Sequence, residues 1–504
     1  MKTRNHKNLE RRKEKIARRL ERKRFVDQTK PMLKGGNVHY EMSGRQQGVS
    51  YGGVAAIHEM VNRLGLPELI NGTVKLLKVH LPYFESDHIL SIAFNVLAGG
   101  TRLEDLERLR QDEAFLDQIG AQRIPDPTTA GDFLRRFTEE YIVRLMEVIH
   151  DVRETVWQKK AARDPKFFDE AIVEIDGTLT ETLGECKGGM DISYKGIWGY
   201  APLVVTLANT REVLYIINRP GNTPSSKDAA GWVDRAIERV GKYFKKVTVR
   251  GDTDFSLTEH LDAWDKKAEF TLGYDACPNL VAAADALETS AWSRLERPPK
   301  YVVRTQERTR PANVKEEIVR ERGFVNQRLL CEDVAEFDYQ PTACQKTYRM
   351  VVVRKNISVE KGESAFLPLI RYFFYITNRW TPSNADIVFS ANDRCDQENI
   401  IAQLKSGIHA LHAPVDDLTS NWAYMVIASL AWTLKAWYGM LIPDAKASHE
   451  VVRMEYKKFL HNFIALPCQI IRGARRVVIR VIGYTRYLEI FFETFDVIRR
   501  LRKT

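Results

Sequence analysis

The sequence lacks a long apolar run that could serve as a membrane anchor. Its longest apolar stretch, from Trp422 to Leu434, stops at Lys435 and is too short to cross a bilayer, so it predicts a buried helix. The first residues are densely charged, where a secretory signal peptide would need an apolar segment. We therefore expect a cytoplasmic protein with no membrane partner.

Closely spaced cysteines are also absent. The chain has six cysteines, and no two of them have the Cys-x-x-Cys spacing that zinc sites use. Free thiols are compatible with a reducing cytoplasm. Composition therefore gives no support to a zinc-binding or disulfide-stapled protein.

Positive charge is concentrated at the start of the chain. The whole sequence carries 76 Lys and Arg against 66 Asp and Glu, a net charge of +10. Residues 1–35 hold 14 of the basic and 4 of the acidic residues, so this basic arm accounts for the whole excess. A second basic cluster, which includes Arg472, Arg476 and Arg480, lies near the end. Such clusters suit a polyphosphate partner, because each neutralised phosphate releases counterions; the alternative for the arm is a disordered solubilising tail.

The spacing of apolar residues divides the rest of the chain into regions of different predicted secondary structure. Helical spacing after the arm predicts an all-helical N-terminal region. Strands then alternate with helices in the order three strands, helix, strand, helix, strand, which predicts an α/β fold with a mixed sheet and flanking helices. Apolar and charged residues alternate in Tyr301 to Arg304, Glu317 to Arg320 and Met350 to Arg354, which predicts strands of a β-rich insertion within that core. The expected regions are a basic arm at 1–35, a helical region at 36–165, an α/β core at 166–299 and 371–441, a β-rich insertion at 300–370 and a basic C-terminal region at 442–504.

One helix of the N-terminal region is a candidate for DNA recognition. Thr129 stands three residues before Asp132, as at the capped start of a helix that would continue through Arg135 and Arg136. A helix of this kind can enter a groove of DNA or can be part of the scaffold. The sequence leaves both readings open.

Two aspartates follow short apolar runs of strand type. Asp176 comes directly after Ala171 to Ile175, and Asp252 follows Val247 to Val249 and Gly251. The carboxyl ends of strands in an open α/β sheet lie where ligands bind. Each aspartate alone is as readily explained as a turn or cap residue. Together they are more informative, because one sheet presents both at the same edge.

A third carboxylate, Glu398, lies in a predicted helix. At about 100° per residue, Glu398 projects about 40° and Lys405 about 20° from Arg394, so the three would share one stripe of a regular helix. A solvated ladder of salt bridges is the alternative. Three carboxylates can hold two Mg²⁺ (or Mn²⁺) ions per active site, and Arg394 and Lys405 would then grip phosphates.

These residues, in their order and local context, resemble the DDE transposases of bacterial insertion sequences. The matching motifs are Glu174-Ile175-Asp176-Gly177-Thr178, Arg250-Gly251-Asp252-Thr253-Asp254-Phe255, Arg394-x3-Glu398-x6-Lys405, Arg219-Pro220-Gly221-Asn222 and Tyr375-Ile376-Thr377-Asn378. The group that they resemble most is insertion-sequence family thirteen-eighty, a relative of family four. Two positions depart from the pattern: Ala391 stands where the related signature has tyrosine, and Asp254 where glycine is expected.

The resemblance implies a fold, an activity and a set of partners. It implies that residues 166–299 and 371–441 form a ribonuclease-H-like catalytic core, in which Asp176, Asp252 and Glu398 bind the metal ions and catalyse DNA cleavage and strand transfer. It also implies that the all-helical N-terminal region at 36–165 binds DNA. The partners would be double-stranded DNA, as terminal inverted repeats and target, and a second copy of the chain in a synaptic homodimer associated with the nucleoid. Further DNA or phosphate contacts are expected at Arg219, Asn222, Arg250, Arg135 and Arg136. The alternatives are a nuclease or resolvase on the same fold and a non-catalytic DNA-binding regulator.

Overall fold

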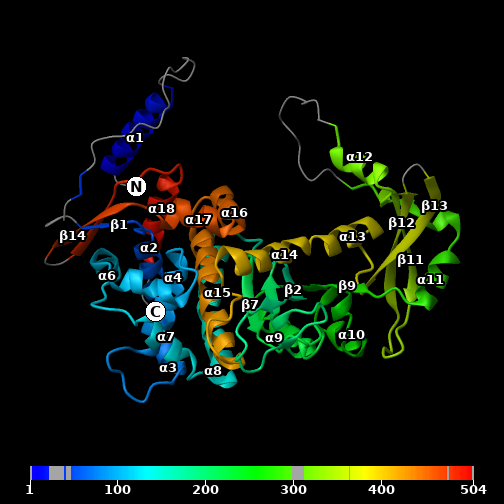
Figure 1. Cartoon of the computed structure of the whole chain (residues 1–504), viewed down its shortest axis with the longest axis horizontal. Helices are drawn as coiled ribbons and strands as arrows, with labels where there is room; N and C mark the ends of the chain where they lie inside the picture. Colours follow the sequence, from blue (N-terminus) through cyan, green and yellow to red (C-terminus); the bar gives the residue numbers. More distant parts are fainter. Residues whose placement is uncertain are drawn as a thin grey trace. The chain divides into compact units, whose positions relative to one another are not determined.

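A computed structural model of the chain describes residues 3–21, 39–40, 47–297, 312–361, 364–473 and 476–501 (Figure 1). The chain divides into two units, and both are assembled from separate segments. Unit 1 combines residues 1–168, 177–223 and 399–504, and unit 2 combines residues 169–176 and 224–398. Residues 22–24 of the basic arm and the strand predicted at 301–304 lie outside the described residues.

Unit 1 is mainly helical. Its helices are α1 (Thr3–Glu21), α2 (Val54–Arg63), α3 (Leu66–Thr73), α4 (Glu85–Leu97), α5 (Leu106–Arg110), α6 (Glu113–Ile119), α7 (Pro127–Leu134), α8 (Glu139–Ala161), α15 (Leu418–Leu441), α16 (Ala445–Arg453), α17 (Tyr456–Phe459) and α18 (Leu488–Arg500). Its strands form one sheet of β1 (Gln47–Val49), β14 (Cys468–Gly473) and β15 (Arg476–Val481), a second of β3 (Thr180–Glu181), β5 (Trp198–Tyr200) and β4 (Asp191–Ile192), and an antiparallel pair of β6 (Leu203–Leu207) and β7 (Glu212–Ile217).

The core of unit 1 surrounds α15, which confirms the buried helix predicted from the apolar run. This helix packs against α4, α8, α16 and β7. The fully buried Glu212 of β7 accepts hydrogen bonds from Arg153 and Trp157 of α8 and from Trp437 of α15, at 2.8–2.9 Å. These donors satisfy a carboxylate that would otherwise be costly to bury. Among the residues that the structure describes, none of the helices is both long enough and apolar enough to cross a membrane.

Helix α7 differs from its prediction at both ends. It begins at Pro127, and Asp126 caps it by accepting a hydrogen bond from the Thr129 backbone at 3.0 Å. It ends at Leu134, so Arg135 and Arg136 follow the helix instead of extending it. An aspartate followed by proline is a stronger start signal than the Thr129 spacing, since proline fits the first turn of a helix.

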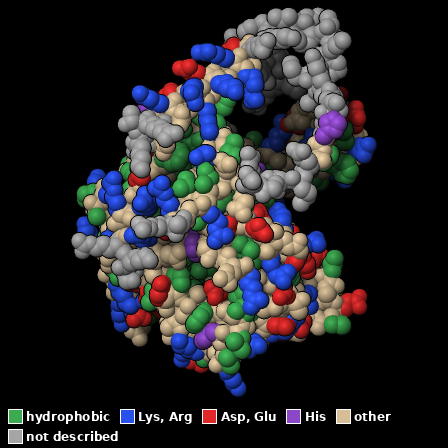
Figure 2. Space-filling model, turned by 90° about the vertical axis from the view of Figure 1, so that its left-hand side faces the viewer, with side chains coloured by type: hydrophobic (Ala, Val, Ile, Leu, Met, Phe, Trp, Pro, Cys, Tyr) green, Lys and Arg blue, Asp and Glu red, His purple; other side chains and the backbone are tan. Residues whose placement is uncertain are grey.

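The basic N-terminal helix α1 is docked on the C-terminal part of unit 1. Leu9 is buried, and the guanidinium of Arg12 donates hydrogen bonds to the backbone carbonyls of Val481 and Gly483, both at 3.1 Å. The remaining charge of the helix faces outward, and Lys and Arg side chains are spread over this face of the molecule in Figure 2. The exposed basic residues of α1 are Lys7, Arg11, Lys13, Lys15, Arg18 and Arg19.

Unit 2 is built on a mixed sheet. Along the sheet the strands follow the order β10 (Ser293–Arg294), β11 (Val325–Tyr339), β12 (Tyr348–Lys361), β13 (Ser364–Thr377), β9 (Glu269–Tyr274), β8 (Val247–Gly251) and β2 (Ala171–Gly177). Strand β8 pairs in parallel with both of its neighbours, β2 and β9. Strand β9 pairs antiparallel with β13, β13 with β12, and β12 with β11. The helices are α9 (Ala229–Gly241), α10 (Thr258–Trp264), α11 (Pro278–Asp285), α12 (Val314–Glu321), α13 (Asn384–Asn392) and α14 (Cys395–Ala402), which continues into unit 1.

The order of elements from β2 to β9 is the predicted one, with the small strands β3 to β5 added. The insertion differs in one place: the stretch from Glu317 to Arg320, interpreted as strand, lies in helix α12. Asn313 caps this helix by accepting a hydrogen bond from the Glu316 backbone. An apolar and charged alternation over four residues therefore did not distinguish a strand from one face of a short helix.

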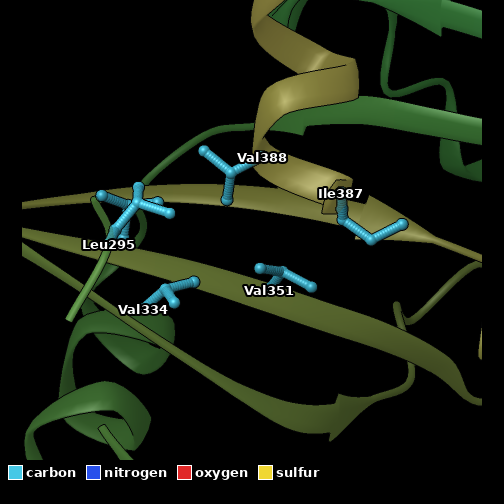
Figure 3. Close-up of a cluster of buried hydrophobic side chains, with 6 residues drawn as sticks. Leu295, Val334, Val351, Ile387 and Val388 are labelled. Carbon is cyan, nitrogen blue, oxygen red and sulfur yellow. The ribbon is translucent and has the colours of Figure 1, made fainter. Parts of the chain in front are cut away.

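A hydrophobic cluster seats α13 on the long strands of unit 2 (Figure 3). Ile387 and Val388 of α13 pack against Val334 of β11, Val351 of β12 and the neighbouring Leu295, and all five are buried. This packing fixes the helix whose last turn leads to Arg394.

Candidate active site

A buried ion pair joins the two strands that carry the aspartates. Glu174 of β2 and Arg250 of β8 are register partners, and their side chains approach to 2.7 Å in a nearly solvent-free position. Arg250 also donates a hydrogen bond to the Ser390 carbonyl of α13 at 2.8 Å. Each partner stands two residues before an aspartate, so the pair aligns the chain at Asp176 with the chain at Asp252.

The three predicted carboxylates meet at one arginine. The guanidinium nitrogens of Arg394 lie 3.4 Å from Asp252 Oδ2, 3.8 Å from Asp176 Oδ2 and 3.5 Å from Glu398 Oε1. The Asp176 side chain is 17% exposed and that of Glu398 is 56% exposed, so the cluster opens toward solvent on the helix side. The structure thus brings together Asp176, Asp252, Glu398 and Arg394 within unit 2.

The arginine stands between the acids instead of beside them. In the described ranges, no three His, Cys, Asp or Glu side chains converge closely enough to hold a metal ion directly. The carboxylates are spaced around a guanidinium, which is a larger cation than Mg²⁺. The cluster therefore surrounds a positive charge that belongs to the chain itself.

The helix expected to carry Arg394, Glu398 and Lys405 is not regular. Helix α13 ends at Asn392, and Arg394 lies in the turn before α14. After Ala402 the chain continues as a π-helix over Gln403–Gly407, which contains Lys405. A π-turn has more residues than an α-turn, so the 20° predicted between Arg394 and Lys405 is wrong. The spacing of four residues between Arg394 and Glu398 still brings these two side chains together.

Asp252 is held in place by its own loop. Its Oδ1 accepts a hydrogen bond from the Asp254 backbone at 3.1 Å, which leaves Oδ2 toward Arg394. Burial raises the pKa of Asp252 above its ordinary value; Arg394 opposes this shift, and the charges of Asp254 and Asp275 add to it. Burial is the largest of these effects, so the pKa of Asp252 stays raised despite the nearby guanidinium.

Asp275 is an acidic residue of this site that the sequence analysis did not select. It follows β9 directly, as Asp252 follows β8, and Asp176 is the next-to-last residue of β2. The three strands are parallel neighbours, so each brings an aspartate to the same edge of the sheet. The signal was in the sequence, as an apolar run from Phe270 to Leu272 followed closely by an acid.

A cavity of about 380 Å³ adjoins the cluster within unit 2. Asp252, Arg394 and Asn392 line one part of it, and aromatic residues of β13, among them Tyr372 and Tyr375, line another. Ala391 also lines this cavity, so the position where the related signature has tyrosine contributes only a methyl group.

The other predicted DNA contacts have different settings. In unit 2, Arg250 is buried in its ion pair. In unit 1, Arg219 is buried and donates to the Ala201 carbonyl at 3.0 Å, whereas Asn222 and Arg136 are exposed. Arg135 lies 2.9 Å from Asp132 and 2.7 Å from Asp416. Contacts of these residues and of Lys405 with phosphate stay predictions.

Comparison with known proteins identifies the family. The family model described as "Transposase DDE domain group 1" matches residues 30–503, nearly the whole chain. The chain belongs to this transposase family. None of the curated proteins matches it. Among solved structures, the transposase is similar at 10% identity to a piggyBac transposase in a cryo-EM synaptic complex with hairpin DNA; the match covers 92% of this chain and 88% of the other, with a TM-score of 0.37.

Proposed function

We propose that this transposase cuts DNA at the ends of an insertion sequence and joins the cut ends to target DNA. Asp176, Asp252 and Glu398 are the proposed catalytic residues, and they are also the proposed metal ligands. The observation that carries the proposal is the convergence of these three distant acids on Arg394, at 3.4–3.8 Å.

The acids offer only oxygen donors and already surround one cation, and both properties suit divalent metal ions once the side chains draw closer together. Such donors suit Mg²⁺ or Mn²⁺. Two ions, when bound, stabilise the attacking and leaving oxygens of a phosphodiester. The protein contributes the orientation: the Asp254 backbone holds Oδ1 of Asp252, and the Glu174–Arg250 pair aligns the two strands. The proposed role of Arg394 is to bind a DNA phosphate, to which a guanidinium can donate two parallel hydrogen bonds.

The finer classification is also part of the proposal. We assign β2, β8 and β9, with helices α9 and α10, to a ribonuclease-H-like core. The long strands β11 to β13 are the β-rich insertion between the second aspartate and the glutamate. The parallel strands and the position of this ribbon support the assignment. The motifs resemble insertion-sequence family thirteen-eighty.

The proposed partners are terminal inverted repeats, target DNA and a second copy of the chain in the synaptic complex. The basic arm and the helical region of unit 1 would hold the DNA, with Lys405, Asn222, Arg135 and Arg136 as further contacts. The exposed basic face of α1 supports this role, because its Lys and Arg side chains already lie in solvent, where phosphates can reach them. The expected location is the bacterial cytoplasm, at the nucleoid.

The test is cleavage and joining of DNA fragments that carry the inverted repeats flanking the gene. We expect Mg²⁺-dependent activity that falls at least about 100-fold in Asp176→Ala, Asp252→Ala and Glu398→Ala, while DNA affinity is kept. Asp169→Ala is the matched control, because Asp169 is a surface acid of unit 2 that pairs with Lys245 at 2.7 Å.

The outcomes separate the alternative functions. Cleavage without joining would indicate a nuclease or resolvase. Binding of the repeats by the wild type without any cleavage would indicate a regulator. Full activity in the three alanine variants would remove the assigned site.

A further inference from the structure

Arg394 has unusual geometry for an arginine among carboxylates. A charge-assisted N–H···O bond is typically about 2.7–2.9 Å long. The buried Arg250 reaches 2.7 Å from Glu174, but Arg394 comes no closer than 3.4 Å to any of its three acids. Arg394 therefore neutralises the acids collectively and makes no short bond to one of them.

The side chain of Arg394 has open space next to it, into which it can turn. The residue lies in the turn between α13 and α14, outside both helices, and its side chain is 25% exposed. It also lines the cavity of about 380 Å³ beside Asp252. A small rotation of the side chain thus exchanges contacts with the acids for contacts with whatever enters this cavity.

Charge makes the exchange conditional. Without a cation among them, Asp176, Asp252 and Glu398 repel one another at close range, so the guanidinium is retained while no other cation is present. Divalent ions bring more charge to the same oxygens. They cannot share the position with the guanidinium, because like charges at this distance repel.

We propose that Arg394 is an exchangeable counterion: it holds the three carboxylates together in the metal-free protein and turns to a DNA phosphate when divalent ions take its place. This inference rests on the proposed function. It adds that metal binding and DNA binding are coupled through one side chain. Because such coupling is reciprocal, metal ions strengthen DNA binding by the same factor by which DNA strengthens metal binding.

The first test measures metal binding without DNA. Arg394→Met keeps the length of the side chain and removes its charge, so the competitor is gone. We expect Mn²⁺, titrated by calorimetry, to bind this variant about 10-fold more tightly than it binds the wild type, within the usual range of such couplings. Arg394→Lys, which keeps the charge, stays close to the wild type. Arg354→Met is the matched control, because Arg354 is 26% exposed and lies 3.3 Å from Asp333.

Three results would decide against the inference or its basis. Equal or weaker Mn²⁺ binding by Arg394→Met means that the arginine does not compete. A gain of the same size in Arg354→Met means that the effect is one of net charge alone. Mn²⁺ binding that persists in Asp176→Ala and Asp252→Ala overturns the proposed metal site itself, whatever Arg394 does.

The second test measures DNA binding by fluorescence anisotropy, with Ca²⁺ as the oxygen-seeking divalent ion. The wild type should bind a repeat-end duplex several-fold more tightly when Ca²⁺ is added, and Arg394→Met should lose this gain while keeping its ion-free affinity. A gain that survives in Arg394→Met contradicts the turn of Arg394 toward phosphate. A melting curve of each variant, with and without Mn²⁺, verifies that the proteins compared are folded.

Discussion

Glu174 and Arg250 form an ion pair of 2.7 Å across two parallel strands, in a position that solvent hardly reaches. Glu174 stands two residues before Asp176, and Arg250 stands two residues before Asp252. Since successive side chains of a strand alternate between faces, residues two apart point to the same side of the sheet. The relative position of the two aspartates thus depends on two buried residues outside the carboxylate cluster.

Breaking this pair should destabilise unit 2 and misalign its aspartates. Arg250→Met leaves Glu174 buried without its partner, which typically costs about 3–5 kcal/mol. Glu174→Gln with Arg250→Met removes both charges and should recover much of that loss. Chemical denaturation measures the stabilities. If the single variant unfolds at the same denaturant concentration as the wild type, the pair contributes nothing to the fold.

Gly273→Ala should reduce activity by displacing Asp252. A Cβ at this position on β9 would lie 2.9 Å from the Thr253 backbone nitrogen and 3.1 Å from the Asp252 carbonyl carbon. Relief of this contact moves the Asp252 loop, and a misplacement of about 1 Å near reacting groups can cost about 100-fold in rate. Cleavage rate at saturating DNA is the measurement. Gly231→Ala in α9 is the control, because its Cβ would meet nothing within 4 Å; equal rates in both variants would contradict the argument.

Arg11 and Arg12 should behave differently in DNA binding, although they are neighbours in the basic arm. Arg11 is exposed, so Arg11→Gln should remove one phosphate contact and reduce the slope of log affinity against log salt by about 0.9. Arg12 instead ties α1 to the Val481 and Gly483 carbonyls. Arg12→Gln should release α1, so the slope of log affinity against log salt should fall by more than the loss of one phosphate contact explains. Equal slopes in the two variants would show that docking of α1 has no role in binding.

Glu85 should make the helical region sensitive to acid. It is buried at the start of α4; burial raises its pKa, but hydrogen bonds from the Leu77 and Leu76 backbones and from His80 outweigh this, so the pKa lies below the ordinary value. A lowered folded-state pKa adds stability above about pH 4.5 that is lost as the pH falls through the folded value.

Glu85→Gln tests this stabilisation. The variant should be less stable than the wild type by about 1–3 kcal/mol at pH 7, and the difference should shrink at pH 3, as measured by denaturation at both pH values. Glu68→Gln, which replaces an exposed acid of α3, should leave the free energy of unfolding unchanged at both pH values. A constant difference at both pH values would assign the effect to packing instead of charge.

The sequence was informative where a residue's role follows from its immediate neighbours. Asp176 and Asp252 were found because each follows an apolar run, and the structure places both at the ends of parallel strands. Asp275 obeys the same rule and was overlooked, because its strand was not followed to the next acid. The buried helix α15 was predicted from the apolar run between Trp422 and Leu434.

Features that depend on distant contacts were not predictable in this way. The helix angle assigned to Lys405 failed because a π-turn begins after Ala402, and the local sequence gives no sign of it. The buried partner of Arg250 required knowledge of strand register. Arg394 was expected to face phosphate, and its position among the acids depends on three residues that only the fold brings together.

Both units are interleaved along the chain, and this has a consequence for synthesis on the ribosome. Strand β2 emerges early, but its neighbour in unit 2, β8, follows only after residues 177–223, which belong to unit 1. Unit 2 has all its segments only once Glu398 has been synthesised. Unit 1 needs residues 399–504 as well, so it is completed last. A chain that stops before Glu398 therefore has neither unit complete, and we expect such a truncated product to be degraded by proteases instead of competing with the full chain for DNA.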